Sequence, residues 1–228
     1  MAAETVCPGV HRIGGPGISD PEDCCVYLVE DAGELAVIDA GLGRSVPVLL
    51  ENIRALGFEP RRVRLLIATH GHIDHIGGLA GLKAATGAAI AAHALELSAV
   101  REGWPDLTAA GYYGVAYEPV EVDLVFSQGR ETLTVGSLPL TVLHAPGHTP
   151  GSIVVFGDFG GQRVLFGQDL HGPFDVAWGS DLSLWRRSAR MLLELEADIL
   201  CEGHFGVYRP REKVRGYIER CLEANGEE

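Results

Sequence analysis

Residues 69–78 of the chain read Thr69-His70-Gly71-His72-Ile73-Asp74-His75-Ile76-Gly77-Gly78. Three imidazoles and one carboxylate fall within six consecutive positions of this stretch. Imidazole nitrogens and carboxylate oxygens are the ligands that zinc and similar metals take in proteins. Packing alone rarely calls for so many imidazoles, because each buried ring must find partners for two nitrogens. The stretch therefore predicts a metal site.

The residues on either side of this cluster place it after a strand. The apolar run 63–68 precedes it and predicts a strand, and an alanine- and leucine-rich helix follows it. In extended backbone the first two histidines project to the same side and could face one ion. The aspartate and the third histidine come where the chain turns toward the helix, so they could face a second ion. The two glycines permit the backbone conformations of such a turn.

One segment cannot complete two coordination spheres, so we expect further ligands from distant parts of the chain. The stretch His144-Ala145-Pro146-Gly147-His148-Thr149-Pro150-Gly151-Ser152 follows another apolar strand. Its proline and glycine residues favour a rigid loop, which suits the fixed placement of His148. Asp169 ends a strand and His204 follows yet another. All these candidates lie just after strands, where loops gather at one edge of a sheet.

The composition is that of an ordinary globular protein. The chain has 228 residues, of which 46% are apolar and 21% are charged. No long linker or low-complexity stretch interrupts it, so we expect a single domain over residues 1–228. The formal net charge of −13 repels phosphate backbones. We therefore expect a small-molecule substrate and no nucleic-acid partner.

The cysteines and the N-terminal residues bear on the compartment. The chain has five cysteines, an odd number, and none of them forms a Cys-x-x-Cys pair of the metal-binding kind. We interpret them as reduced thiols. No signal peptide and no apolar run of membrane-spanning length is visible. We therefore expect a cytoplasmic protein without a membrane partner, and its oligomeric state is left open.

Short apolar runs alternate with helical patterns along the chain. Ser183 is the expected N-cap of the helix that begins at residue 184. The expected helices are 46–56, 79–85, 94–101, 184–195 and 211–224. The expected strands are 25–29, 35–38, 63–68, 88–91, 122–126, 138–143, 153–156, 164–166 and 199–201.

The ordered set of motifs closely resembles the metallo-β-lactamase superfamily over residues 25–210. The resemblance is carried by residues 69–78, by Pro146-Gly147-His148-Thr149-Pro150-Gly151-Ser152, by Asp169 and by Gly203-His204. The turn Val37-Ile38-Asp39-Ala40-Gly41 matches an early acidic turn of that family. The resemblance implies an α+β fold, a four-layer αββα sandwich with the site at one edge.

The resemblance also implies a ligand set for two divalent metal ions, with zinc favoured and iron or manganese open. Asp39 would orient a metal-binding histidine, and such outer contacts have a sound physical basis. Asp169 would bridge the two ions, and either Asp74 or Asp169 could carry a proton. One ion would be bound by His70, His72 and His148, and the other by Asp74, His75 and His204.

The expected activity is metal-dependent hydrolysis. A hydroxide generated at a dinuclear site would attack the carbonyl of a thioester or related acyl bond, as the similarity to the glyoxalase II branch implies. That branch carries a C-terminal helical extension that binds glutathione. Only 24 residues follow His204, which puts a glutathione thioester in doubt and favours a smaller or different acyl substrate.

Two alternatives remain open. A lactonase would use the same hydroxide on a cyclic ester, and a pocket tyrosine near the metals would favour it. A persulfide dioxygenase of the same fold would use a single iron held by two histidines and a carboxylate. Elemental analysis separates the hydrolases from the dioxygenase. Two zinc ions per chain would support a hydrolase, and iron together with oxygen consumption would support a dioxygenase. A β-lactamase and a metal-dependent nuclease are less favoured, and a binding module without turnover remains as the non-enzymatic contrast.

Several residues outside the ligand set are candidates for the substrate pocket. The segment 104–117 is rich in aromatic residues and is interpreted either as a substrate wall or as a loop anchored on the sandwich. His171 lies two residues after Asp169 and could line the pocket or be a solvated loop histidine. The pocket candidates are His171, Tyr208, Trp104, Tyr112 and Tyr113.

Overall fold

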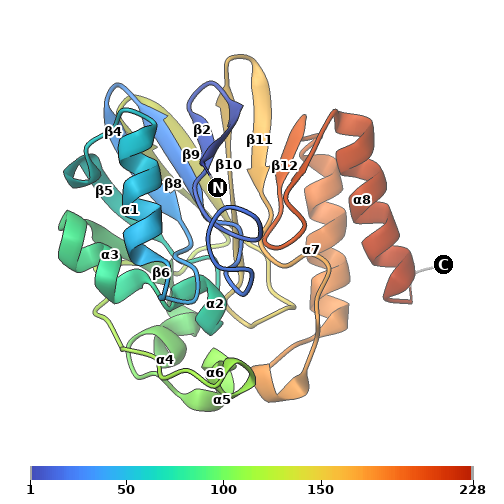
Figure 1. Ribbon diagram of the computed structural model, residues 1–228. Coiled ribbons are helices and arrows are strands. Elements are labelled where there is room, and N and C mark those ends of the chain that lie inside the picture. The colour runs from blue at the N-terminus through green and yellow to red at the C-terminus, as the bar shows by residue number, and fades with distance from the viewer. Residues whose placement is uncertain (1, 227–228) are drawn as a thin grey trace.

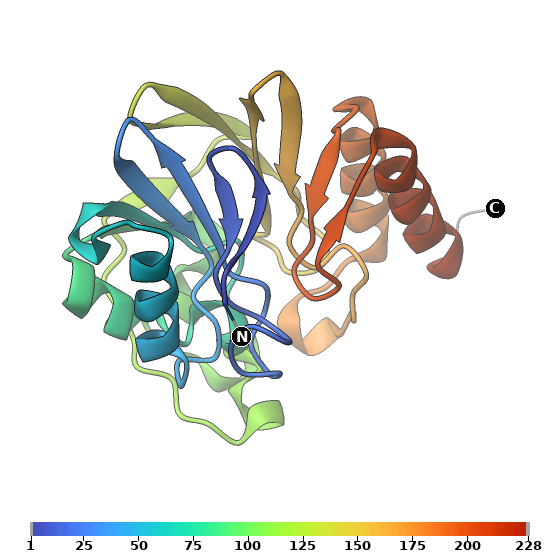
Figure 2. The same ribbon diagram turned by 45° about the horizontal axis from the view of Figure 1, so that its top comes forward.

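Two β-sheets stand face to face at the centre of the computed structural model, which describes residues 2–226 (Figures 1 and 2). Within this range the first sheet has its strands side by side in chain order. They are β1 (Glu4–Cys7), β2 (Val10–Arg12), β3 (Tyr27–Asp31), β4 (Glu34–Ile38), β5 (Val63–Ile67), β6 (Ala89–His93) and β7 (Leu124–Phe126). β1 to β4 pair antiparallel, whereas β4 to β7 pair parallel.

The second sheet is built from the second half of the chain. Its spatial order is β13-β12-β11-β10-β9-β8 within the described residues. The strands are β8 (Arg130–Val135), β9 (Leu138–His144), β10 (Ile153–Phe159), β11 (Gln162–Phe166), β12 (Ile199–Cys201) and β13 (Val207–Tyr208). Only β11 and β12 pair parallel, because a long helix connects them.

Helices cover the outer faces of both sheets (Figures 1 and 2). α1 (Val46–Ala55) and α3 (Leu79–Thr86) pack on the first sheet, and α7 (Leu182–Glu194) and α8 (Arg211–Ala224) pack on the second. The shorter elements are α2 (Ile73–Ile76), α4 (Leu97–Val100), α5 (Pro105–Thr108), α6 (Ala110–Tyr113) and the 3₁₀ turns η1 (Pro60–Arg62), η2 (Ala94–Glu96) and η3 (Val176–Trp178). Among residues 2–226, no helix combines the length and apolar character needed to span a membrane.

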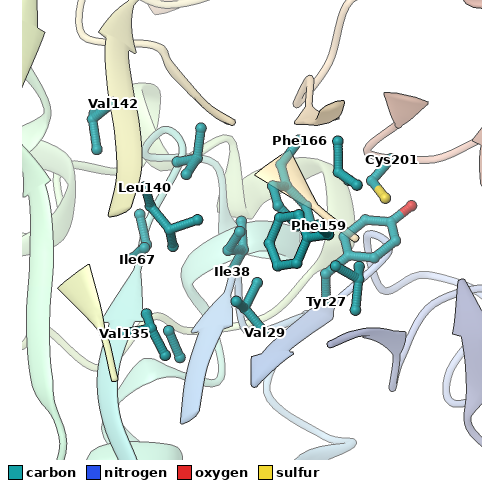
Figure 3. Close-up of a cluster of buried hydrophobic side chains, with 14 of the residues drawn as sticks. Tyr27, Val29, Ile38, Ile67, Val135, Leu140, Val142, Phe159, Phe166 and Cys201 are labelled. Carbon is teal, nitrogen blue, oxygen red and sulfur yellow. The ribbon is translucent and has the colours of Figure 1, made fainter. Parts of the chain in front are cut away.

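Strand periodicity divides the apolar side chains between two kinds of core. In β5, Leu65 and Ile67 point between the sheets, whereas Leu66 points to the helix layer. Because both faces of the strand are buried over residues 65–67, these residues form a continuous apolar run, whereas Arg64 before them is exposed. Figure 3 shows the core between the sheets, where Ile38 and Ile67 of the first sheet meet Leu140 and others of the second.

This architecture confirms the expected α+β sandwich with helices on both outer faces. The expected strand at 25–29 begins later, at Tyr27, and both Cys24 and Cys25 are buried free thiols in the segment before it. The helix expected over 94–101 is a 3₁₀ turn followed by one short helix. The prediction of Ser183 as an N-cap was wrong. α7 begins at Leu182, and the Asp181 side chain accepts a hydrogen bond from the backbone N–H of Leu184 at 2.9 Å.

Truncation of Leu140 tests the core between the sheets. Leu140 is fully buried in β9, so Leu140→Ala removes apolar contacts and leaves a cavity. We expect the free energy of unfolding to fall by about 2–5 kcal/mol in urea titrations. Val176, which is 88% exposed, provides the control, and Val176→Ala should change stability by less than about 0.5 kcal/mol. Equal effects of the two substitutions would contradict this packing.

Candidate metal centre

Strand direction brings the predicted ligand loops to one edge of the sandwich. β4 and β5 run parallel, so the loops that carry Asp39 and residues 69–75 leave the first sheet at the same edge. β9 and β11 both pair antiparallel with β10, and β12 runs parallel to β11. The loops after β9, β11 and β12 therefore also leave at one edge of their sheet. This is the end near α2, α5 and α6, drawn lowest in Figure 1.

Three histidines form the first group. The ligand atoms of His70, His72 and His148 lie within 4.8 Å of one another, and all three side chains are buried. His148 Nε2 is 3.0 Å from His72 Nδ1. Two of these rings come from the first sheet and one from the second, so the group joins the sheets. A backbone hydrogen bond from Ile153 N–H to Thr69 O at 2.9 Å joins them at the same place.

A second group combines Asp74, His75 and His204. Their ligand atoms also lie within 4.8 Å of one another. His204 Nε2 is 3.2 Å from Asp74 Oδ2 and 3.3 Å from His75 Nε2. Asp74 and His75 lie in α2, which is the turn of helix that directly follows His72.

Asp169 lies between the two groups. Its Oδ2 is 3.2 Å from His204 Nε2 and 3.6 Å from His148 Nε2. Its Oδ1 is 3.2 Å from His75 Nε2. The structure thus brings all seven predicted ligand residues into one cluster, with this carboxylate in contact with both groups.

The donor set fits divalent metal ions. His70 Nε2 and His72 Nε2 are buried without a hydrogen-bond partner, and burial of an unpartnered polar atom is costly. In each group, two ring nitrogens face each other within 3.0–3.3 Å. Nitrogen and oxygen donors that converge in this way suit zinc, iron or manganese.

Outer contacts orient several of the rings. Asp39 Oδ2 lies 2.8 Å from His75 Nδ1, and the same carboxylate accepts hydrogen bonds from the Thr69 N–H and hydroxyl. The backbone carbonyl of Pro173 lies 2.8 Å from His148 Nδ1. Because these contacts occupy the outer nitrogen, Nε2 of His75 and of His148 is left to face the cluster. Asp39 therefore lies beside His75, one of the predicted ligands.

The two groups differ in their affinity for protons. Burial lowers the pKa of His70, and it lowers the pKa of His72 to about 3 and that of His148 to about 4. Burial also acts to lower the pKa of His204, but the Asp169 and Asp74 carboxylates outweigh it and raise the value to about 10. Burial of His75 is likewise outweighed, by Cys24, Asp169 and other acidic groups, so its pKa is raised. At neutral pH the first group is ready to bind a cation, whereas the second holds protons.

Glycine at two positions allows the ligand loops to approach. A Cβ on Gly203 would lie 2.3 Å from Asp169 Oδ1. Gly147 has φ +140°, and a Cβ there would lie 2.3 Å from the backbone of Trp185. A side chain at Gly203 would displace the central carboxylate, and one at Gly147 would push the His148 loop away from α7.

A cavity of about 300 Å³ opens onto the cluster. The predicted pocket residues His171, Tyr112 and Tyr113 line it. The Trp178 ring stands 4.6 Å from the His72 ring and 5.6 Å from the Tyr112 ring. The other residues that line the cavity are His72, Asp74, Ala109, His148, Asp169, Pro173 and His204.

Two predicted pocket residues lie outside this cavity. Tyr208 stacks on Tyr217 of α8, with ring centroids 4.1 Å apart. Trp104 is 55% exposed just before α5 and does not line the cavity. Sequence reasoning missed Pro173, because no periodicity or motif marks this position, whereas Ala109 lies in the segment 104–117 that was interpreted as a possible substrate wall.

Comparisons with known proteins agree with this geometry. A family model described as the metallo-beta-lactamase superfamily matches residues 19–204. A hydroxyacylglutathione hydrolase of Cereibacter sphaeroides is 32% identical over 80% of this chain and 62% of that protein, so the chain spans less than two thirds of it. The human acyl-coenzyme A thioesterase MBLAC2 is 31% identical over 86% of this chain and 79% of that protein. The structure of a B3 metallo-beta-lactamase with an active-site glutamic acid aligns with a TM-score of 0.83 and 26% identity, over 98% of this chain and 88% of that chain.

The different proton affinities predict proton release when metal binds. At about pH 7.5 the raised pKa values keep His75 and His204 protonated, and metal ligation requires both rings to lose a proton. We expect zinc to release about one to two protons per chain, as measured by calorimetry in buffers of different ionisation enthalpy. The release should shrink as the pH rises through about 10, the pKa of His204, because this ring then loses its proton before metal binds. Release that is absent at neutral pH, or that grows with pH, would contradict the assignment.

Proposed function

The chain belongs to the metallo-beta-lactamase superfamily, and on this premise we propose that it is a metal-dependent hydrolase that cleaves a thioester or related acyl bond of a small molecule. The observation that carries the proposal is the convergence of two nitrogen- and oxygen-donor groups around Asp169 at the floor of a cavity. The names of the relatives support the acyl chemistry, because one is a hydroxyacylglutathione hydrolase and the other an acyl-coenzyme A thioesterase.

We propose that two divalent ions, zinc by preference, bind at the two groups, with His70, His72 and His148 at one and Asp74, His75 and His204 at the other. Asp169 would contact both ions. Ions bound there would polarise the substrate carbonyl and lower the pKa of water. Asp74 and Asp169 serve in this proposal as ligands more than as proton carriers. The histidines around Asp169 outweigh its burial and lower its pKa, which makes it a weak base.

The cavity walls favour a substrate with an uncharged acyl group. Tyr112, Tyr113 and Trp178 present ring surface to the space above the cluster. Within the described residues, no lysine or arginine lines this cavity. Aromatic walls without a cation suit an apolar or aromatic acyl group close to the scissile bond.

A lactonase is the second candidate, and Tyr113 favours it. Its side chain lines the cavity beside Asp74, so a tyrosine hydroxyl stands near the proposed ligands. Tyr208, the other tyrosine proposed for such a role, stacks on Tyr217 and does not line the cavity. Turnover of lactones but not of thioesters by the same preparation would favour this candidate. Iron in the purified protein, together with oxygen consumption on persulfides, would favour a dioxygenase instead.

Removal of one ligand tests the metal chemistry. His72→Ala takes one ring from the three-histidine group, so we expect the zinc content to fall and thioester hydrolysis to drop at least about 100-fold. The fold should persist, because the group lies at a sheet edge outside the apolar cores. Elemental analysis, circular dichroism and turnover of an aryl thioester measure the three effects.

The matched control is His11→Ala, which removes a histidine in β2 that pairs with Thr5 at 3.0 Å, remote from the cluster. This variant should keep both metal and activity. Full turnover in His72→Ala would overturn the assigned role of the ligand group.

Substitution of Tyr112 tests the proposed acyl wall. Tyr112 lines the cavity although 74% of its surface is exposed, so Tyr112→Ala should cost little stability. We expect the KM for a phenylacetyl thioester to rise about 5- to 10-fold with little change in kcat, because apolar contact area is lost. The KM for an acetyl thioester should stay nearly constant. Trp104→Ala, at an exposed aromatic residue nearby but outside the cavity, should change neither, and equal losses in both variants would argue against a specific wall.

A further inference from the structure

Two buried glutamates stand beside the metal centre without belonging to either ligand group. Glu96 is 4% exposed and Glu202 is fully buried. A buried carboxylate is costly unless hydrogen-bond donors surround it. Each of these two is surrounded by donors, and the donors come from the loops that carry the proposed ligands.

Glu96 joins the two loops of the three-histidine group. Its Oε1 accepts hydrogen bonds from the Thr149 hydroxyl at 2.8 Å and from the Gly151 N–H at 2.7 Å, both in the loop that carries His148. On its other side Glu96 lies against the backbone of Gly71, which lies between His70 and His72. One carboxylate therefore connects a loop of the first sheet to a loop of the second.

The two glycines let the loops come this close to the carboxylate. A Cβ on Gly71 would lie 2.7 Å from Glu96 Oε2, and a Cβ on Gly151 would lie 2.7 Å from Glu96 Oε1. Any side chain at either position would push its loop away from Glu96. The lack of a side chain at Gly71 and at Gly151 is consistent with a contact that sets the distance between the two loops.

Glu202 makes a corresponding connection on the other side of the cluster. Its Oε2 accepts hydrogen bonds from the N–H groups of His204 and Phe205, each at 2.7 Å. Its Oε1 lies 2.9 Å from His171 Nδ1, in the loop that carries Asp169. This carboxylate fixes the turn that presents His204 and ties it to the Asp169 loop.

We propose that Glu96 and Glu202 are positioning residues, each assigned to one ligand group: Glu96 sets the geometry of His70, His72 and His148, and Glu202 sets that of His204. The inference rests on the proposed function, because it presumes that both groups bind metal. Charge-assisted hydrogen bonds to buried carboxylates are strong and directional. Outer contacts of this kind change metal affinity about 10- to 100-fold in other proteins.

The test measures zinc affinity in backgrounds that retain one ligand group each. His204→Ala disables the second group and leaves the three-histidine group, and His72→Ala does the reverse. Glu96→Gln and Glu202→Gln are then added to each background, and competition with a chromophoric chelator gives the zinc affinity. Each glutamine variant serves as the matched control for the other, since both replace a buried carboxylate by an amide of the same shape.

We expect Glu96→Gln to weaken zinc binding about 10- to 100-fold in the His204→Ala background and less than about 3-fold in the His72→Ala background. Glu202→Gln should show the opposite pattern. Thr149→Val removes one donor to Glu96 and keeps the carboxylate. It should therefore weaken zinc binding by a smaller factor in the His204→Ala background, whereas Thr149→Ser should restore the affinity. The threonine variants keep the test decisive for Glu96 even where Glu96→Gln impairs folding.

Three outcomes would overturn the inference. Unchanged zinc affinity in Glu96→Gln with the three-histidine group intact would remove the role of Glu96 and leave the proposed function standing. Equal losses of zinc affinity in both backgrounds would show that the glutamine variants act on folding in general, and that neither glutamate serves one ligand group. Failure of both backgrounds to bind zinc at all would overturn the proposed function itself, and this inference with it.

Discussion

The rest of the structure depends on keeping seven titratable side chains packed together at one edge of a β-sandwich. Apart from the more accessible His204, these side chains are buried, where water cannot satisfy their polar atoms. The chain offsets part of this cost from outside, because Asp39 and a backbone carbonyl hold the outer nitrogens of two rings. Inside the cluster, His70 Nε2 has no hydrogen-bond partner, and His72 Nδ1 and His148 Nε2 face each other at 3.0 Å. A cation that binds them would stabilise the folded chain as well as supply chemistry, because a ligand that binds only the folded state shifts the folding equilibrium.

The ligand cluster could be predicted because four of its seven residues lie close together in the sequence and the other three follow predicted strands. A His-x-His-x-Asp-His sequence after an apolar run states both the chemistry of the site and its place at a strand end. Parallel β4 and β5, and parallel β11 and β12, then carry the other ligand loops to matching edges. The fold was predictable for a related reason, since strands buried on both faces have continuous apolar runs. Strands β1, β2 and β13 were missed because two to four residues are too few to show a period. Strand β8 was also missed, because Leu133 and Val135 are the only apolar residues in its sequence.

The walls of the cavity could be predicted only in part, because their side-chain directions depend on tertiary packing. Tyr208 illustrates this point. It lies in β13, where alternation directs Val207 to the core between the sheets and Tyr208 to the helix layer, against Tyr217. Because no strand is predicted from the sequence at residues 207–208, the sequence alone does not determine which face Tyr208 occupies. Trp178 lies in a 3₁₀ turn, and only the folded path of the segment after Asp169 brings it to His72.

The metal centre and the cavity walls therefore come from different parts of the architecture. The proposed ligands lie at or near strand ends, in loops tied together by buried carboxylates. Tyr112, Tyr113 and Trp178 come from short helical turns in the connections between strands. Changes in these connections can alter the shape of the substrate space while the cluster keeps its geometry. This separation explains in physical terms why one fold can support several acyl chemistries, and why the metal ligands are easier to predict from this sequence than the substrate.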